Sequence, residues 1–182
     1  MSEKYKIGEF TRPHFLTMTV VDWVDLFTRP VYKDIIIESL DYCIKHKGLI
    51  LYSYCIMPSH LHIIASSNDF ALNDIVRDFK KFTCKAIIEA IKSDTESRRV
   101  WMLKKFEFAA RRIKRGVNHK VWKDGFHPME LTSNRMMEQK LEYIHQNPVV
   151  EGYVFKAEDW IYSSARFYIC QEAGKVALQL LS

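Results

Sequence analysis

The sequence lacks several features that define large classes of proteins. It has no run of about 18 apolar residues, so it predicts no helix that crosses a membrane. The segment MSEKYKIGEF has no apolar stretch, so we expect no secretory signal there. The four cysteines show no CxxC spacing, which indicates buried free thiols and a reducing, cytoplasmic location. A Gly-rich phosphate loop is also missing, so no ATP-dependent chemistry is predicted.

Positive charge, by contrast, is concentrated in one part of the chain. The 182 residues carry a net charge of +5 and suffice for one domain spanning residues 1–182. Residues 98–124 hold ten basic side chains against two acidic ones, an excess greater than that of the whole chain. This basic segment is typical either of a track for a polyanion or of a solvated loop.

Hydrophobic periodicity predicts an α+β domain. We expect strands at 14–21, 49–56 and 60–66 and helices at 30–45 and 72–92, the second helix with Phe82 on its buried stripe. This is the split order of a ferredoxin-like or RRM-like antiparallel sheet with helices on one face. Farther along, the sequence predicts a strand within 121–131, a helix from about 133 that ends at Pro148, and a helical tail at about 155–182.

Two histidines one residue apart are the strongest local signal. His60 and His62 lie in a predicted strand, where alternate side chains point to the same face. Imidazole is a common ligand of divalent ions, so the pair could share a metal ion, although isolated pairs of this kind are more often structural. A catalytic site would need a third ligand. The run also partly matches the histidine-triad hydrolases, but Ile64 stands where their third histidine would be.

The predicted helix after residue 133 carries two further candidates. Tyr143 and Asn147 are spaced i, i+4 and would share one helix face. Asn147 offers an amide oxygen that suits Mg²⁺ or Mn²⁺, and Tyr143 offers a phenolic nucleophile. The residues alone leave another interpretation open, in which Tyr143 belongs to the core and Asn147 caps the helix. A residue before proline avoids helical geometry, which would place Asn147 outside the helix.

Together the two motifs resemble the REP-associated tyrosine transposases, a branch of the HUH single-tyrosine transposases. The resemblance rests on CIMPSHLHIIA, which contains Pro58, His60 and His62, and on EYIHQNPVVEGYV, which contains Tyr143 and Asn147. It covers nearly the whole chain. It implies a metal-dependent single-stranded DNA endonuclease and strand transferase, with the tyrosine helix near the free face of the sheet.

The resemblance also implies a role for each matched residue. His60, His62 and Asn147 would bind Mg²⁺ or Mn²⁺, although related transposases carry glutamine in place of Asn147. Tyr143 would attack single-stranded DNA beside a hairpin and give a 5′-phosphotyrosine intermediate with a free 3′-hydroxyl. The alternative function is a domesticated protein that binds DNA hairpins without cleaving them. The chain could act as a monomer or as a homodimer.

Basic side chains outside these motifs are candidates for contacts with the DNA. Those on the second helix repeat every four residues, which ordinary solvation of a helix explains equally well. A histidine before Pro128 is a further candidate, although such a residue more often belongs to a turn. The candidates are Arg77, Lys81, Lys85, Arg111, Arg112, Lys114, Arg115 and His127.

Overall fold

An antiparallel sheet forms the centre of the protein. The computed structural model describes residues 11–68, 70–93, 95–112 and 116–181. Within them the sheet has four strands in the order β2-β3-β1-β4. The strands are β1 (His14–Thr19), β2 (Leu49–Ile56), β3 (His60–Ser67) and β4 (Met129–Glu130). Each neighbouring pair is antiparallel, so the predicted ferredoxin-like α+β class is confirmed.

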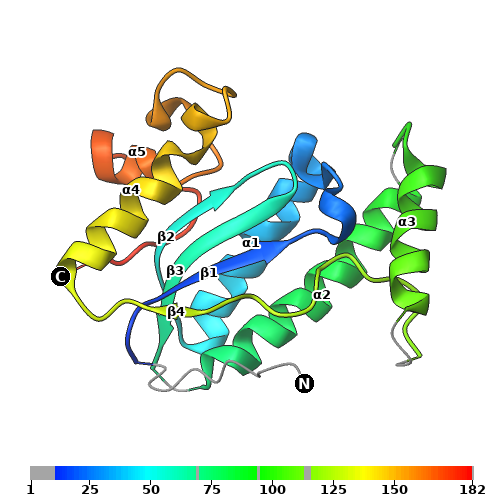
Figure 1. The fold of residues 1–182 in the computed structure, drawn as a ribbon, viewed down its shortest axis with the longest axis horizontal. Helices are drawn as coiled ribbons and strands as arrows, with labels where there is room; N and C mark the ends of the chain where they lie inside the picture. Colours follow the sequence, from blue (N-terminus) through cyan, green and yellow to red (C-terminus); the bar gives the residue numbers. More distant parts are fainter. Residues whose placement is uncertain (1–10, 69, 94, 113–115, 182) are drawn as a thin grey trace.

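Helices cover both faces of this sheet. α1 (Pro30–Lys47) and α2 (Leu72–Ser93) lie on one face, and α4 (Asn134–Val150) lies across the other (Figure 1). The strands alternate accordingly, since Leu61 and Ile63 belong to the core under α1 and α2, whereas Ile64 packs with Ile144 of α4. The histidines of β3 therefore face α4.

The helix α4 continues two residues past Pro148, so the prediction that this proline ends the helix was wrong. Pro148 is buried in the last turn, where few backbone hydrogen bonds remain to be lost. The carbonyl of Asn147 accepts a hydrogen bond from the Glu151 amide at 3.0 Å, and Gly152 then leaves the helix with φ 76°. Asn147 consequently keeps its helical position one turn beyond Tyr143.

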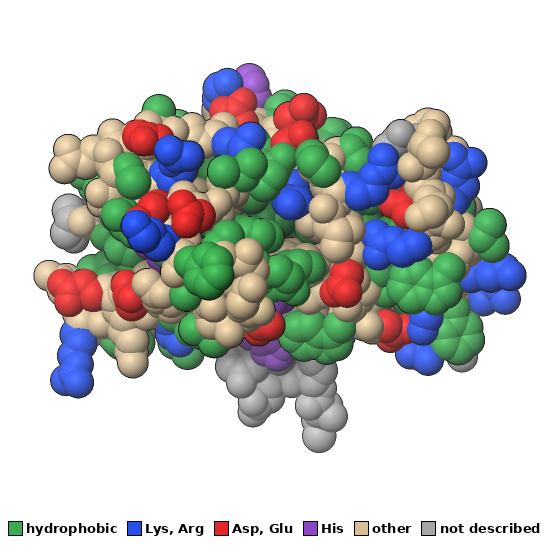
Figure 2. All heavy atoms as spheres, turned by 90° about the horizontal axis from the view of Figure 1, so that it is seen from above, with side chains coloured by type: hydrophobic (Ala, Val, Ile, Leu, Met, Phe, Trp, Pro, Cys, Tyr) green, Lys and Arg blue, Asp and Glu red, His purple; other side chains and the backbone are tan. Residues whose placement is uncertain are grey.

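The basic segment contains a helix that the sequence did not predict. α3 (Arg99–Arg111) contacts α2, and its buried residues Met102, Phe106 and Ala110 recur at helical spacing. Figure 2 shows lysine and arginine side chains gathered over the end of the molecule that α3 forms. The segment is thus an ordered basic helix rather than a solvated loop along its first half.

Three smaller predictions also need correction. The strand within 121–131 is reduced to β4, with an isolated bridge between Val20 and Trp122. Phe82 is 63% exposed, because the adjacent Thr83 takes the buried position and accepts a hydrogen bond from the Trp122 indole. Cys170 is exposed rather than buried.

The tail beyond residue 155 is less helical than expected. Its described residues, up to 181, contain only a 3-10 turn, η3 (Ala157–Asp159), and the short helix α5 (Ala165–Cys170). Gln171 stops α5 in the left-handed conformation, with φ 57°. Among the described helices none combines the length and the apolar character needed to span a membrane.

Candidate functional site

The two histidines of β3 lie together under α4. Their ring centroids are 4.7 Å apart, with the planes inclined by 76°. His62 is buried and His60 is half-buried. The arrangement follows from the two-residue repeat of the strand, which sends both side chains to the same face, as predicted.

A hydroxyl group contacts the Nδ1 atom of each histidine. Thr17 Oγ1 lies 2.9 Å from His62 Nδ1, and Ser59 Oγ lies 3.2 Å from His60 Nδ1. Thr17 reaches this position because the register of β1 and β3 places it directly opposite His62. When the Nδ1–H groups donate to these oxygens, both Nε2 lone pairs remain free to bind a metal ion.

α4 adds Tyr143 and Asn147 to the histidines. The Tyr143 ring meets the His62 ring edge-on, with centroids 5.4 Å apart, and 46% of Tyr143 is exposed. Asn147 lies close enough to His60 to raise the pKa of that imidazole, although no hydrogen bond of normal geometry joins the two side chains. The structure thus brings the four predicted residues together from a strand and a helix eighty residues apart in the sequence.

Two buried acceptor atoms of this cluster have no hydrogen-bond partner. They are His62 Nε2 and Asn147 Oδ1. Leaving such atoms unpaired is unfavourable, and buried polar atoms normally find a partner. An imidazole nitrogen and an amide oxygen are both metal ligands, so a divalent ion would satisfy the two atoms.

The pKa values favour the form of the histidines that binds metal. Burial, together with the charges of His60 and Lys140, lowers the pKa of His62 to about 3. Burial also lowers the pKa of His60, although Glu151 and Asn147 act in the opposite direction. Both imidazoles are therefore neutral at pH 7, as metal coordination requires.

The donor set fits a divalent ion, but it contains no carboxylate. Over the described part of the chain, no cluster of three or more His, Cys, Asp or Glu side chains could hold a metal ion. Beside the two imidazoles, the amide of Asn147 offers a neutral oxygen of the kind that suits Mg²⁺ or Mn²⁺.

Sequence reasoning missed two residues of this site. Thr17 could not be found, because the register that sets it opposite His62 is a property of the folded sheet. Lys140 could have been found, since it lies three residues before Tyr143 on the same helix face. Its ammonium group is 5.5 Å from the centroid of the Tyr143 ring and 4.9 Å from that of Phe15.

The predicted DNA-contacting residues are spread along α2, α3 and the segment after α3. Lys81 and Lys85 are exposed on α2 and have no ion pair with any described residue, whereas Arg77 pairs with Asp74 and Asp78. Two more candidates already contact a neighbouring side chain of the protein, and a third has an unusual backbone conformation. Arg111 pairs with Glu107, Arg112 lies over the Phe108 ring, and exposed His127 has φ 41°; Lys114 and Arg115 lie outside the described residues.

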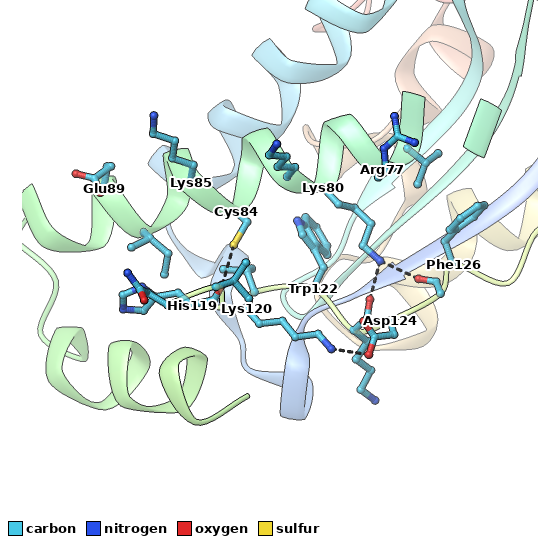
Figure 3. A pocket seen from close by; sticks show the side chains of 18 of the residues that line it. Arg77, Lys80, Cys84, Lys85, Glu89, His119, Lys120, Trp122, Asp124 and Phe126 are labelled. Carbon is cyan, nitrogen blue, oxygen red and sulfur yellow. Dashed lines mark hydrogen bonds and ion pairs between the residues drawn. The ribbon is translucent and has the colours of Figure 1, made fainter. Parts of the chain in front are cut away.

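A shallow groove of about 640 Å³ separates α2 from residues 117–126 (Figure 3). Arg77, Lys81 and Lys85 contribute to its lining. Figure 3 shows Lys80 crossing from α2 to the opposite segment, where its ammonium donates to the carbonyls of Lys123 at 2.6 Å and Gly125 at 2.8 Å. Burial lowers the pKa of Lys80 to about 8. Lys80 therefore fixes the far wall of the groove.

Comparison with known proteins gives matches at the level of the fold. No protein-family model matches the chain, and no curated protein matches it. A solved structure of a REP-associated tyrosine transposase bound to a REP hairpin is similar over 100% of this chain and 94% of its own, with a TM-score of 0.59 and 18% identity. A "putative transposase" from Deinococcus radiodurans R1 aligns with 79% of this chain and 92% of its own, with a TM-score of 0.46 and 14% identity. The chain therefore has the fold of a REP-associated tyrosine transposase, as the two sequence motifs predicted.

Proposed function

We propose that this protein is a REP-associated tyrosine transposase, a metal-dependent enzyme that cleaves and rejoins single-stranded DNA next to a hairpin. One observation carries the proposal. The Tyr143 ring lies against His62, while His62 Nε2 and Asn147 Oδ1 are both buried without a partner. If Tyr143 were only a core residue and Asn147 only a helix cap, nothing would account for an unpaired Asn147 Oδ1 and an unpaired His62 Nε2 in the same cluster. The solved structure with the same fold holds a DNA hairpin, which supports the choice of substrate.

His60, His62 and Asn147 are the residues that would hold the metal ion. A bound Mg²⁺ or Mn²⁺ would polarise the non-bridging oxygens of a phosphodiester and align it for attack. The protein contributes the placement of the ligands. Thr17 and Ser59 orient the imidazoles from behind, and α4 fixes the amide of Asn147 one turn from Tyr143.

Tyr143 supplies the nucleophile in this proposal. Its phenolic oxygen forms a bond to phosphorus, the bond from phosphorus to the 3′ oxygen breaks, and the 3′ oxygen takes up a proton. The half-exposed position of Tyr143 lets its own proton pass to water. The ammonium of Lys140 beside the ring stabilises the negative charge that develops on the phenolic oxygen. Attack by a second 3′-hydroxyl on the phosphotyrosine reverses the step and joins new ends.

The test is the detection of a covalent protein–DNA adduct. The protein is incubated with Mn²⁺ and a single-stranded oligonucleotide that carries a hairpin and a label at its 3′ end, which stays with the 5′-phosphotyrosine fragment, and the products are separated on a denaturing gel. We expect a labelled adduct that disappears in Tyr143→Phe. We also expect it to disappear when the metal is chelated, and to fall strongly in His60→Ala and Asn147→Ala.

The matched control is Tyr153→Phe. Tyr153 is also half-exposed and follows α4 directly, but it stacks near Trp160 rather than on the histidines. An adduct of equal yield in Tyr143→Phe would refute the nucleophile. Hairpin binding without any adduct in the parent protein would instead favour the domesticated, non-catalytic alternative.

A further inference from the structure

Trp23 is an exposed aromatic side chain held in an unusual backbone conformation. It ends the 3-10 turn η1 (Val21–Trp23), and 57% of its surface is open. Asp22 and Trp23 both have positive φ, 53° and 54°, a conformation that residues with a Cβ rarely adopt. Strained backbone of this kind persists where its surroundings impose it, and it is frequent at functional sites.

The hairpin that precedes His60 imposes this conformation. The Val20 amide donates to the Ser59 carbonyl at 2.9 Å, and the Phe27 amide donates to the Pro58 carbonyl at 2.8 Å. Both ends of the segment that contains Trp23 are therefore attached to the turn that leads into β3. The strain fixes the indole at the rim of the histidine pair.

Contacts of Trp23 connect the proposed metal site with the basic part of the chain. Its ring centroid is 5.9 Å from that of His60, with the planes inclined by 78°. The Lys123 ammonium also contacts this ring and lies 4.5 Å from its centroid. The neighbouring Asp22 forms an ion pair with Lys105 of α3 at 3.6 Å. The indole thus contacts both His60 and Lys123 of the basic segment, and its neighbour Asp22 contacts a second lysine of that segment.

We propose that Trp23 is a stacking platform for a base of the single-stranded substrate next to the cleaved phosphate. The proposal rests on the proposed function, whose site it extends. Bases stack on aromatic rings irrespective of their sequence, and neighbouring lysines meet the phosphates. A nucleotide whose phosphate lies at His60 and His62 has Trp23 as an exposed ring beside it, apart from Tyr143 itself, and Lys123 as the adjoining cation. The stacked base holds the strand in line with Tyr143.

Binding measurements with abasic oligonucleotides test this platform. All variants carry Tyr143→Phe so that no cleavage interferes, and affinity is measured with Mn²⁺ by fluorescence anisotropy while one abasic nucleotide is moved along the single strand. We expect Trp23→Ala to weaken binding roughly 5- to 150-fold. In the parent protein, which keeps Trp23, we expect one abasic position to cause a similar loss of affinity. In Trp23→Ala the same position should cause almost no loss. Trp23→Tyr should recover most of the affinity.

Tyr42→Ala is the control for the loss of an exposed aromatic side chain. Tyr42 is 55% exposed on α1, where it packs against His46, so its removal should change affinity less than twofold. If Trp23→Ala binds as tightly as its parent, or if every abasic position weakens both proteins equally, the platform is refuted. Loss of affinity in Trp101→Ala alone would place stacking on α3 and would refute it as well.

A second measurement needs no change at Trp23. A 2-aminopurine base at the sensitive position should lose fluorescence when the protein binds, and no quenching at any position would contradict the proposal. These outcomes are independent of adduct formation. If Tyr143 forms the adduct but no abasic position depends on Trp23, the stacking platform alone is refuted. If one position depends on Trp23 but no adduct forms, the catalytic function is refuted and the platform stands.

Discussion

Removing the Thr17 hydroxyl should weaken metal binding without opening the site. Thr17→Val keeps the shape of the side chain but removes the hydroxyl oxygen that lies 2.9 Å from His62 Nδ1. The Nδ1–H group then has no acceptor, and the proton can move to Nε2, where it occupies the lone pair needed by the metal. Loss of such a supporting hydrogen bond typically lowers metal affinity about 10- to 100-fold, or about 1.4–2.7 kcal/mol.

The assay is titration calorimetry of the protein with Mn²⁺ at pH 7. The same strand provides a matched control, Thr19→Val. Thr19 lies two residues farther along β1, opposite His60, and its hydroxyl has no hydrogen bond to a described residue. We expect Thr19→Val to bind Mn²⁺ within twofold of the wild-type protein. Equal Mn²⁺ affinity in Thr17→Val and Thr19→Val would refute the role assigned to the Thr17 hydroxyl.

Two further predictions follow from the protonation states and from the attachment of α4. Because the pKa values of His60 and His62 are lowered, both imidazoles are already neutral at pH 7, and metal binding should release at most about 0.2 proton per ion. Calorimetry in buffers of different ionisation enthalpy measures this number, and release of a full proton would contradict the lowered pKa values. Ser164→Ala should lower the free energy of unfolding by about 2–3 kcal/mol, because buried Ser164 Oγ lies 2.8 Å from both His145 Nε2 and Ser53 Oγ. Urea titrations measure this change, and a value under about 0.5 kcal/mol would show that the buried hydrogen bonds of Ser164 contribute little to stability.

The sequence was sufficient to predict the helices and strands that have a clear hydrophobic periodicity. The helix α1 begins at Pro30 and ends where Gly48 adopts φ 65°, both readable as helix signals. Two-residue alternation placed His60 and His62 on one face of β3. These features are local, so neighbouring residues are enough to determine them.

The features that escaped prediction depend on contacts between distant segments. α3 was hidden because its charges dominated its four-residue apolar pattern, which matters only once α2 lies beside it. Whether α4 continues past Pro148 depends on the burial of this residue in the folded protein. The position of Thr17 opposite His62 depends on the register of the strands. Trp23 gave no sequence signal, because its left-handed backbone is imposed by the hairpin beneath it.

The position of α4 has a consequence for the number of molecules that the proposed reaction would need. The proposed nucleophile Tyr143 and the proposed ligand Asn147 lie on the same chain as the two imidazoles, and His145 attaches the inner side of their helix to Ser164. Under the proposed function, each polypeptide would carry its own set of reacting groups. We therefore expect turnover to rise linearly with protein concentration, with no encounter between two copies, so that a single molecule bound at a DNA hairpin would be a sufficient unit of catalysis.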